Sequence, residues 1–598
     1  MKEYAAPLRD MRFVLREIAP LDEVTKLPGY EETSQELVDE ILKEAGKFAA
    51  GVLSPLNRVG DRDGAKWKDG EVQTSPGWKD AYGKFVEAGW NALSFSPEHG
   101  GQGLPRLVAS LVEEMWNGAN MAFALCPMLT KGSIEALELC GSPALKERYL
   151  GKLVSGEWAG TMLLTEPNAG SDLAAVRTKA VPQGDGTYKL SGQKIFITYG
   201  EQDLTENIVH LALARTPTAP EGVKGISLFV VPKFLPTADG GLGARNDVRC
   251  VSLEHKLGIH GSPTAVLALG DGEGAVGWLV GEENRGLEYM FVMMNAARFQ
   301  VGIEGVGLSQ RAYQVAVDYA KERLQGQELG AKSRDRVAIV RHPDVRRMLV
   351  EMRARTEAMR ALAAVVAAAT DVARVHPDAA RRKASQAFVE LMIPVVKGWS
   401  TENANHVTSL GIQVHGGMGY VEETGAAQLY RDARITTIYE GTTGIQAADL
   451  IGRKVARDGG AALGAAVAEM RATEAALRSE DGSTQAALAA RLGEGIAALE
   501  KAGKFVATSY ATEVRRVAVG AVPFLELLGV VAGGWQMGRA ALAAARRLRE
   551  GEGDAGFYRA KLATARFYAD HVLTKAPGLA AAVVDGADGA LAIEDEQL

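Results

Sequence analysis

Residues 431–446 read RDARITTIYEGTTGIQ, a stretch that places Glu440 between an aromatic residue and a glycine. The neighbourhood of Glu440 is otherwise mostly apolar. Its carboxylate therefore either pairs with Arg431 or Arg434, or has a raised pKa that suits it to abstract a proton. The residue pattern leaves both interpretations open.

Three segments upstream carry polar groups in turns or, in KIFIT, at the end of a predicted strand. TEPNAGSD (165–172) and KIFIT (194–198) offer hydroxyls that can donate hydrogen bonds to a flat polar ring, although such residues more often cap the backbone. In QVHGGMGY (413–420) the glycines let backbone N–H groups approach a phosphate, although a glycine-rich turn is usually only a turn. Each segment alone is a weak signal.

The spacing of apolar residues divides the chain into regions. Helical spacing runs from about Leu37 to Lys152, interrupted by EHGGQGLP (98–105). Between Gly160 and Gly281, short β-prone runs separated by Gly, Pro and Asp predict a compact antiparallel sheet or barrel. Helical spacing returns in one long helix over 286–323 and continues to about residue 454.

The last part of the chain, from Ala461, is alanine-rich and amphipathic, which predicts an appended helical domain with an acidic end. Its most apolar stretch, Val517–Trp535, contains Pro523, Glu526 and four glycines. A membrane span needs about 20 nearly uninterrupted apolar residues. We therefore expect a buried helix there and no membrane span.

Bulk composition excludes several classes of protein. A chain of 598 residues, 47% of them hydrophobic, is too long for one core and should form three or four packed units. The net charge of −7 is spread over well-mixed charges, which argues against a nucleic-acid partner. Three distant cysteines, and an N-terminus that carries acidic residues and has no apolar segment, favour a cytoplasmic location. His255 and His260 lack a third ligand, so no metal is expected.

Taken together and in this order, the segments closely resemble the acyl-CoA dehydrogenase family. The match runs over about residues 37–454 and includes EHGGQGLP, TEPNAGSD, KIFIT, a long helix with Arg298 and YAKER (319–323), QVHGGMGY and IYEGT. The resemblance implies a mainly α fold with a central β domain. We expect an N-terminal helical domain (1–159), a middle antiparallel β barrel or sheet (160–285), a C-terminal four-helix bundle (286–458) and an appended helical domain (459–598).

The same resemblance implies an FAD cofactor that lies between the domains and across a subunit boundary. Thr165 and Thr198 would bind the isoalloxazine ring, and Ser171 would lie beside flavin and acyl-CoA. The remaining cofactor residues implied by the motifs are Arg323, Gln413, Gly417, Thr442 and Gln446, the first three reaching the FAD of a neighbouring subunit. The implied substrate-binding residues are Ser171, Arg298, Tyr439 and Gly441. One departure is Leu324-Gln325-Gly326, where the family usually has Phe-Gly.

In this family a carboxylate removes the α proton of the thioester while a hydride leaves the β carbon for flavin N5, giving a trans-2-enoyl-CoA. Because that proton is only weakly acidic, the site must stabilise the enolate oxygen and present a desolvated base. Some members carry the base just before the arginine that matches Arg298, but this chain has Ala297 there. The family patterns therefore leave Glu440 as the base.

Nearly the whole chain further resembles a longer subgroup, the 3-methylmercaptopropionyl-CoA dehydrogenase type and related long bacterial acyl-CoA dehydrogenases. This implies 3-methylmercaptopropionyl-CoA or a short or medium fatty acyl-CoA as substrate, electron-transfer flavoprotein as acceptor, and a homodimer. An apolar pocket separates such acyl groups by only about 1–3 kcal/mol. An acyl-CoA oxidase that uses O2 and a catalytically idle assembly protein are the alternatives.

Overall fold

The computed structural model describes residues 3–330, 332–333 and 335–598, so the first two residues of the predicted first domain lie outside it. The chain forms two compact units. The helical unit comprises residues 1–46, 105–118 and 301–598, and the sheet unit comprises 47–104 and 119–300. Three helices pass from one unit into the other: α3 (Gln35–Phe48), α6 (Arg106–Cys140) and α8 (Gly286–Glu322).

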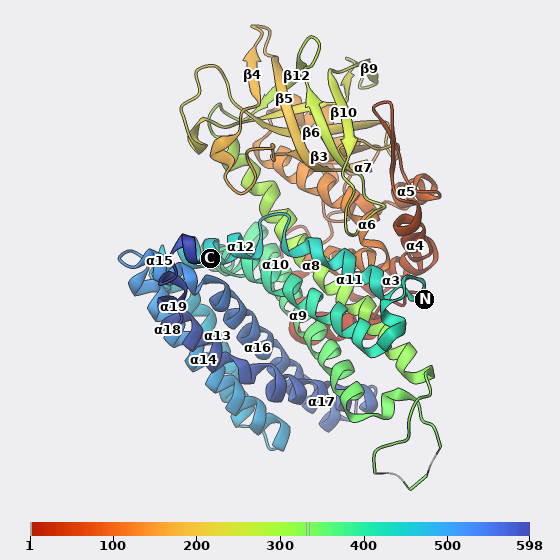
Figure 1. Ribbon diagram of the computed structural model, residues 1–598, viewed down its shortest axis with the longest axis vertical. Helices are drawn as coiled ribbons and strands as arrows, with labels where there is room; N and C mark the ends of the chain where they lie inside the picture. Colours follow the sequence, from red (N-terminus) through yellow and green to blue (C-terminus); the bar gives the residue numbers. More distant parts are fainter. Residues whose placement is uncertain (1–2, 331, 334) are drawn as a thin grey trace. The chain divides into compact units, whose positions relative to one another are not determined.

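The sheet unit is built on eight strands in the order β10-β11-β5-β12-β7-β6-β3, with β4 paired to β5 (Figure 1). Their bounds are β3 Trp158–Leu163, β4 Lys179–Pro182, β5 Tyr188–Thr198, β6 Asn207–Ala214, β7 Ser227–Pro232, β10 Val248–Leu253, β11 Thr264–Leu269 and β12 Ala275–Val280. The antiparallel prediction holds for every named pair of this sheet except β3 and β6, which run parallel. These two strands are joined by a long connection that itself contains β4 and β5, and such a crossover permits parallel pairing.

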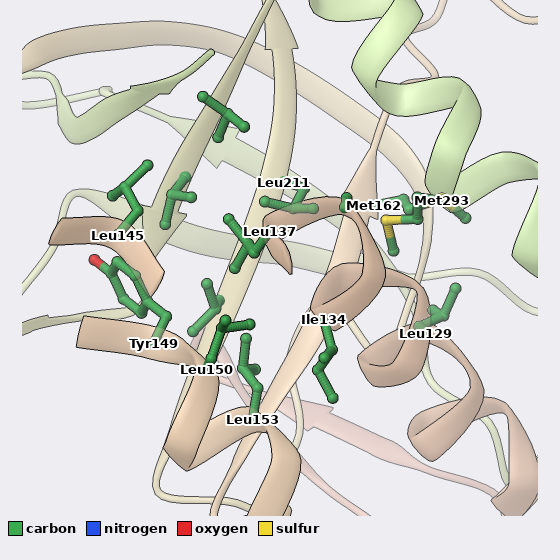
Figure 2. Packing of buried hydrophobic residues seen from close by; sticks show 14 of the residues in the cluster. Leu129, Ile134, Leu137, Leu145, Tyr149, Leu150, Leu153, Met162, Leu211 and Met293 are labelled. Atoms are coloured by element: carbon green, nitrogen blue, oxygen red, sulfur yellow. The ribbon is translucent and has the colours of Figure 1, made fainter. Parts of the chain in front are cut away.

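One core of the sheet unit lies between the sheet and two helices. Ile134 and Leu137 of α6 and Leu150 of α7 (Pro143–Ser155) form one buried cluster with Leu211 of β6 (Figure 2). β6 and β7 are buried along their whole length, as the continuous apolar runs in their sequences require. The other elements of this unit are α4 Ser54–Asp63, α5 Trp78–Glu87 and the hairpins β1 Lys66–Lys68 with β2 Glu71–Gln73 and β8 Phe234–Pro236 with β9 Leu242–Arg245.

The helical unit is centred on two long helices, α9 (Pro343–Val375) and α10 (Ala379–His415), which pack together along their length (Figure 1). Pro343 stands in the first turn of α9, where its missing N–H costs nothing. The remaining helices are α11 Ala426–Arg434, α12 Thr443–Asp449, α13 Ala461–Arg478, α14 Ser483–Ser509, α15 Val514–Val519, α16 Ala521–Glu550, α17 Ala555–His571, α18 Ala576–Asp585 and α19 Ala587–Leu591.

The appended helices belong to this unit and pack on the bundle. α16 contains most of the apolar stretch 517–535, and it is buried as expected. Its Gly529 and Gly533 lie against the ring of Trp399 of α10. No helix among the residues that the structure describes has the length and apolar character needed to cross a bilayer.

The chain before Leu37, for which no element was predicted, is also helical. It forms α1 (Leu8–Phe13), a π-helical segment η1 (Val14–Ile18) and α2 (Leu21–Val24). Met11, Leu15 and Ile18 are fully buried or nearly so. In segments this short, burial against neighbouring helices supplies more stability than helix propensity does.

Candidate active site

Glu440 lies in a short irregular segment between two helices of the helical unit. α11 ends at Arg434, a 3₁₀ turn follows over Ile435–Thr437, and α12 begins at Thr443. Glu440 has φ +55° and Gly441 has φ +87°. Two successive left-handed residues turn the chain sharply, and a non-glycine residue adopts this conformation only when its surroundings enforce it.

Three side chains hold this turn. The ammonium group of Lys397 donates to the carbonyl oxygen of Gly441 at 2.8 Å. The amide of Gln446 donates to the carbonyls of Glu440 at 3.1 Å and Gly441 at 3.2 Å. The hydroxyl of Tyr439 donates to the carboxylate of Glu304 on α8. Five of the predicted site residues therefore lie together in and beside this turn: Tyr439, Glu440, Gly441, Thr442 and Gln446. The hydroxyl of Thr442 caps α12.

Glu304 and Lys397 were missed by sequence reasoning. Both are fully buried, and both contact the residues that flank Glu440. A signal for Glu304 was present, because it is an acidic residue inside the apolar stripe of the long helix. Lys397 follows PVV inside α10, and its role depends on a backbone carbonyl that sequence alone does not place.

The two arginines of the salt-bridge alternative also contact other groups. The guanidinium of Arg431 pairs with Glu422, with Nη2 to Oε2 at 2.8 Å. Arg434 is exposed and donates to the hydroxyl of Thr437.

The end of α8 and the end of α10 meet through a stacked pair of rings. Tyr319 and His415 have ring centroids 4.4 Å apart, and His415 Nδ1 also lies 2.6 Å from the carbonyl of Gly411. Burial lowers the pKa of His415, as expected for an imidazole packed between helices. This stack brings Arg323 into the same region as Gln413 and Gly417, and all three are exposed.

The turn after α10 is open to a ligand. Gly416, at φ +61°, and Gly417 have no atom within 4 Å of where a side chain would begin. Backbone N–H groups beside such glycines can be approached closely by a bulky polar group. This arrangement fits a phosphate-bearing cofactor.

In the sheet unit, TEPNAGSD is tied to the KIFIT end of β5 by a buried carboxylate. Glu166 accepts from the Arg177 and Thr178 backbone N–H groups at 2.7 and 3.0 Å and from the Lys194 ammonium at 2.8 Å. Burial alone would raise the pKa of Glu166, but Lys194 and these hydrogen bonds hold it below its usual value. A backbone hydrogen bond from Ile195 to the Thr165 carbonyl, 2.9 Å, completes the link.

This framework presents the three predicted hydroxyl residues. Thr165 and Thr198 are half-buried and Ser171 is exposed. Beside them, Phe196 is 59% exposed and has φ +59°, and the pairing register between β5 and β11 shifts here. An exposed ring next to these half-buried and exposed hydroxyls suits the edge of a flat heteroaromatic ligand. These donors fit a flavin.

Arg298 belongs to the sheet unit, where it is 4% exposed and lies over the Phe291 ring at 5.9 Å. Ala297 beside it is part of the apolar core. Of the two histidines considered for a metal, His260 pairs with Asp61, with Nδ1 to Oδ1 at 3.0 Å. That hydrogen bond raises the pKa of His260 to about 9. No group of three potential metal ligands occurs in the described parts of the chain.

Four family models match the chain in order. They are the acyl-CoA dehydrogenase N-terminal domain (35–157), middle domain (161–271) and C-terminal domain (284–456), and the acetyl-CoA dehydrogenase C-terminal-like domain (466–594). The chain belongs to the acyl-CoA dehydrogenase family, whose members are oxidoreductases that bind FAD.

Within that family, the chain is 50% identical to 3-methylmercaptopropionyl-CoA dehydrogenase of Ruegeria pomeroyi, over 98% of this chain and 99% of the relative. It is 35% identical to a broad-specificity linear acyl-CoA dehydrogenase of Mycobacterium tuberculosis, over 96% of each chain. Among solved structures, an acyl-CoA dehydrogenase from Bacillus anthracis complexed with FAD superposes with a TM-score of 0.74, at 21% identity over 96% of this chain and 92% of that one. The predicted family, subgroup resemblance and fold class are confirmed.

Proposed function

We propose that this chain catalyses the α,β-dehydrogenation of an acyl-CoA thioester with FAD, and that Glu440 is the base. The observation that carries the proposal is the left-handed turn at Glu440 and Gly441, held by side chains on both sides. Backbone strain of this kind is concentrated at functional sites. Pairing of Glu440 with an arginine is the structural alternative.

The motifs imply a separate role for each group of residues. Thr165, Ser171 and Thr198 would hold the isoalloxazine ring, while Arg323, Gln413 and Gly417 would bind the FAD of a neighbouring subunit. Thr442 and Gln446 would contact FAD beside the base, and Arg298, Tyr439 and Gly441 would line the substrate. When bound, FAD supplies the acceptor for the hydride. Glu440 would hold the α proton, and backbone N–H groups near it would stabilise the enolate oxygen.

For the substrate we propose 3-methylmercaptopropionyl-CoA or a short or medium fatty acyl-CoA. The full-length similarity to the Ruegeria pomeroyi enzyme supports the first. We further propose that electron-transfer flavoprotein accepts the electrons. The proposed assembly is a homodimer, and the proposed location is the cytoplasm. The bounds of the four predicted domains are part of the same proposal.

A panel of acyl-CoA thioesters, including the methylthio compound, assayed with an artificial electron acceptor tests reaction and substrate together. Glu440→Gln should keep fold and ligand binding, because the amide matches the carboxylate in shape. It should slow flavin reduction by at least roughly 10²–10⁴-fold, the usual contribution of a general base.

The measurement is anaerobic stopped-flow bleaching of the flavin after mixing with a good substrate. Bleaching by Glu440→Gln at a rate within a few-fold of the unmodified protein would show that the base lies elsewhere. Rapid hydrogen peroxide formation in air without an added acceptor would favour the oxidase. A purified protein without flavin absorbance would favour the assembly protein.

A further inference from the structure

A second carboxyl group lies directly beneath the turn that carries Glu440. Glu304 of α8 is 0% exposed. One oxygen, Oε2, accepts from the hydroxyl of Tyr439, and the other, Oε1, is buried without a hydrogen-bond partner among the residues that the structure describes. A buried carboxylate with an unsatisfied oxygen is costly, so the protonated form is favoured.

The charged and titratable groups that face Glu304 agree with this. Lys397 of α10 is equally buried and attracts the carboxylate form, whereas Glu440 repels it. Burial dominates, and together with Glu440 it raises the pKa of Glu304 to about 8 against the pull of Tyr439 and Lys397. At neutral pH the carboxyl group of Glu304 is therefore mostly protonated.

The turn at Glu440 needs such support. Its left-handed backbone persists only if the neighbouring residues are fixed. Lys397 fixes Gly441 on one side, at 2.8 Å from its carbonyl oxygen. On the other side, the hydrogen bond from Tyr439 to Glu304 ties the residue before Glu440 to a different helix.

We propose that Glu304 is a positioning residue for the base: its protonated carboxyl group holds Tyr439, and Tyr439 holds the turn that presents Glu440. This inference rests on the proposed function, in which Glu440 is the base. When Glu304 ionises at alkaline pH, its carboxylate still accepts from Tyr439, but its charge repels the carboxylate of Glu440 and displaces the base.

Three single variants and one double variant test the kinetic part of the proposal. Glu304→Leu removes the acceptor at similar volume and should slow flavin reduction roughly 10- to 100-fold, with acyl-CoA affinity little changed. Tyr439→Phe should give a similar loss, and the double variant should lose no more than either single one, because both remove the same link. Glu304→Gln, which still accepts the hydroxyl, should restore most of the rate.

The pH dependence of flavin reduction distinguishes a positioning role of Glu304 from a role in packing alone. The unmodified protein should lose rate with an apparent pKa near 8, and Glu304→Gln should lack this step. If Glu304→Leu reduces flavin at the unmodified rate, if the two losses add, or if Glu304→Gln keeps the alkaline step, the proposal is wrong. Where Glu304→Leu does not fold, the profile of Glu304→Gln decides.

The protonation state of Glu304 can also be measured without catalytic turnover, so that this proposal and the proposed function can fail separately. The infrared difference between the unmodified protein and Glu304→Gln should contain a carboxylic-acid C=O band at neutral pH that disappears above about pH 8. Absence of the band would overturn the proposal. If no acyl-CoA reduces the flavin but the band is present, the proposed function fails while the protonated Glu304 stands.

Discussion

At the scale of single residues, Glu440 and Gly441 both have positive φ, which strains the backbone of the glutamate but not that of the glycine. Glu440 carries a Cβ in the left-handed region, which few non-glycine residues adopt. Gly441 follows with φ +87°, and a Cβ there would lie 2.8 Å from the Gln446 amide nitrogen. Glycine is therefore required at 441 for two independent reasons.

Gly441→Ala should lower the free energy of unfolding by about 1–3 kcal/mol and slow flavin reduction. Gly444→Ala is the matched control, because its Cβ would meet only Thr442 Oγ1 at 3.6 Å, inside α12. Denaturant unfolding and stopped-flow reduction measure the two effects. Equal stability of the two variants would contradict the strained turn.

At the scale of elements, α16 packs against α10 through glycines. Trp399 of α10 is 2% exposed, and its ring fills the space that side chains at Gly529 and Gly533 would need. Close approach of two helices at small residues gives the large ring extensive van der Waals contact. The appended region is thus attached by shape complementarity between two helices.

Gly529→Ala should destabilise the protein, because the new Cβ would lie 2.2 Å from Trp399 Cγ. The cost expected for such overpacking is about 1–3 kcal/mol, more than the helix propensity that alanine adds. Gly464→Ala on α13, with no atom within 4 Å, should instead stabilise slightly. The two changes in thermal midpoint should have opposite signs, and a stabilising Gly529→Ala would refute this packing.

At the scale of the whole chain, a buried charge network joins the first and last parts of the helical unit. Arg360 of α9 binds Glu114 of α6 at 2.9 Å and also binds Asp10 of α1. Lys561 of α17 binds Asp10 and, at 3.0 Å, Glu357 of α9. Burial would raise the pKa of Asp10, but Lys561 and Arg360 lower it to about 2.

Lys561→Met should cost about 3–5 kcal/mol at neutral pH, because it leaves buried carboxylates with one cation fewer. Since the pKa of Asp10 is lower in the folded than in the unfolded chain, its contribution is present above about pH 4 and lost as pH falls towards 2. The difference in free energy of unfolding between Lys561→Met and the unmodified protein should therefore shrink as the pH falls from about 4 towards 2. Lys26→Met, which removes an exposed ion pair with Glu23, is the control and should change the midpoint little. A pH-independent difference would contradict the role of Asp10.

The proposed assembly is testable through the cofactor. Arg323→Ala should lower FAD occupancy in dilute solution by removing a charge-assisted contact worth about 1.5–3 kcal/mol. Arg341→Ala, which removes the ion pair with Glu328 in the same segment, should leave FAD occupancy unchanged. Flavin absorbance and analytical centrifugation follow occupancy and assembly together. Full flavin content in Arg323→Ala, or a tetramer in solution, would contradict this proposal.

Motifs and periodicity predicted much of this architecture. Short apolar runs located a β region between residues 160 and 281, where strands β4 to β12 lie, because strand burial imposes such patterns. The short helices before Leu37 carry too few turns for a periodic signal. The parallel pairing of β3 and β6 was missed because strand direction depends on the path of the chain between strands.

The sequence by itself determined the family, the order of helical and β regions and the local groups around Glu440, because these depend on residue types at short spacing. Only the tertiary structure decided which distant side chains support that turn. Glu304 lies 136 residues before Glu440 in the sequence, and Lys397 lies 43 residues before it. Helix packing brings both side chains to the residues that flank Glu440. No local pattern records such a contact, since it is created by burial of side chains from three separate segments.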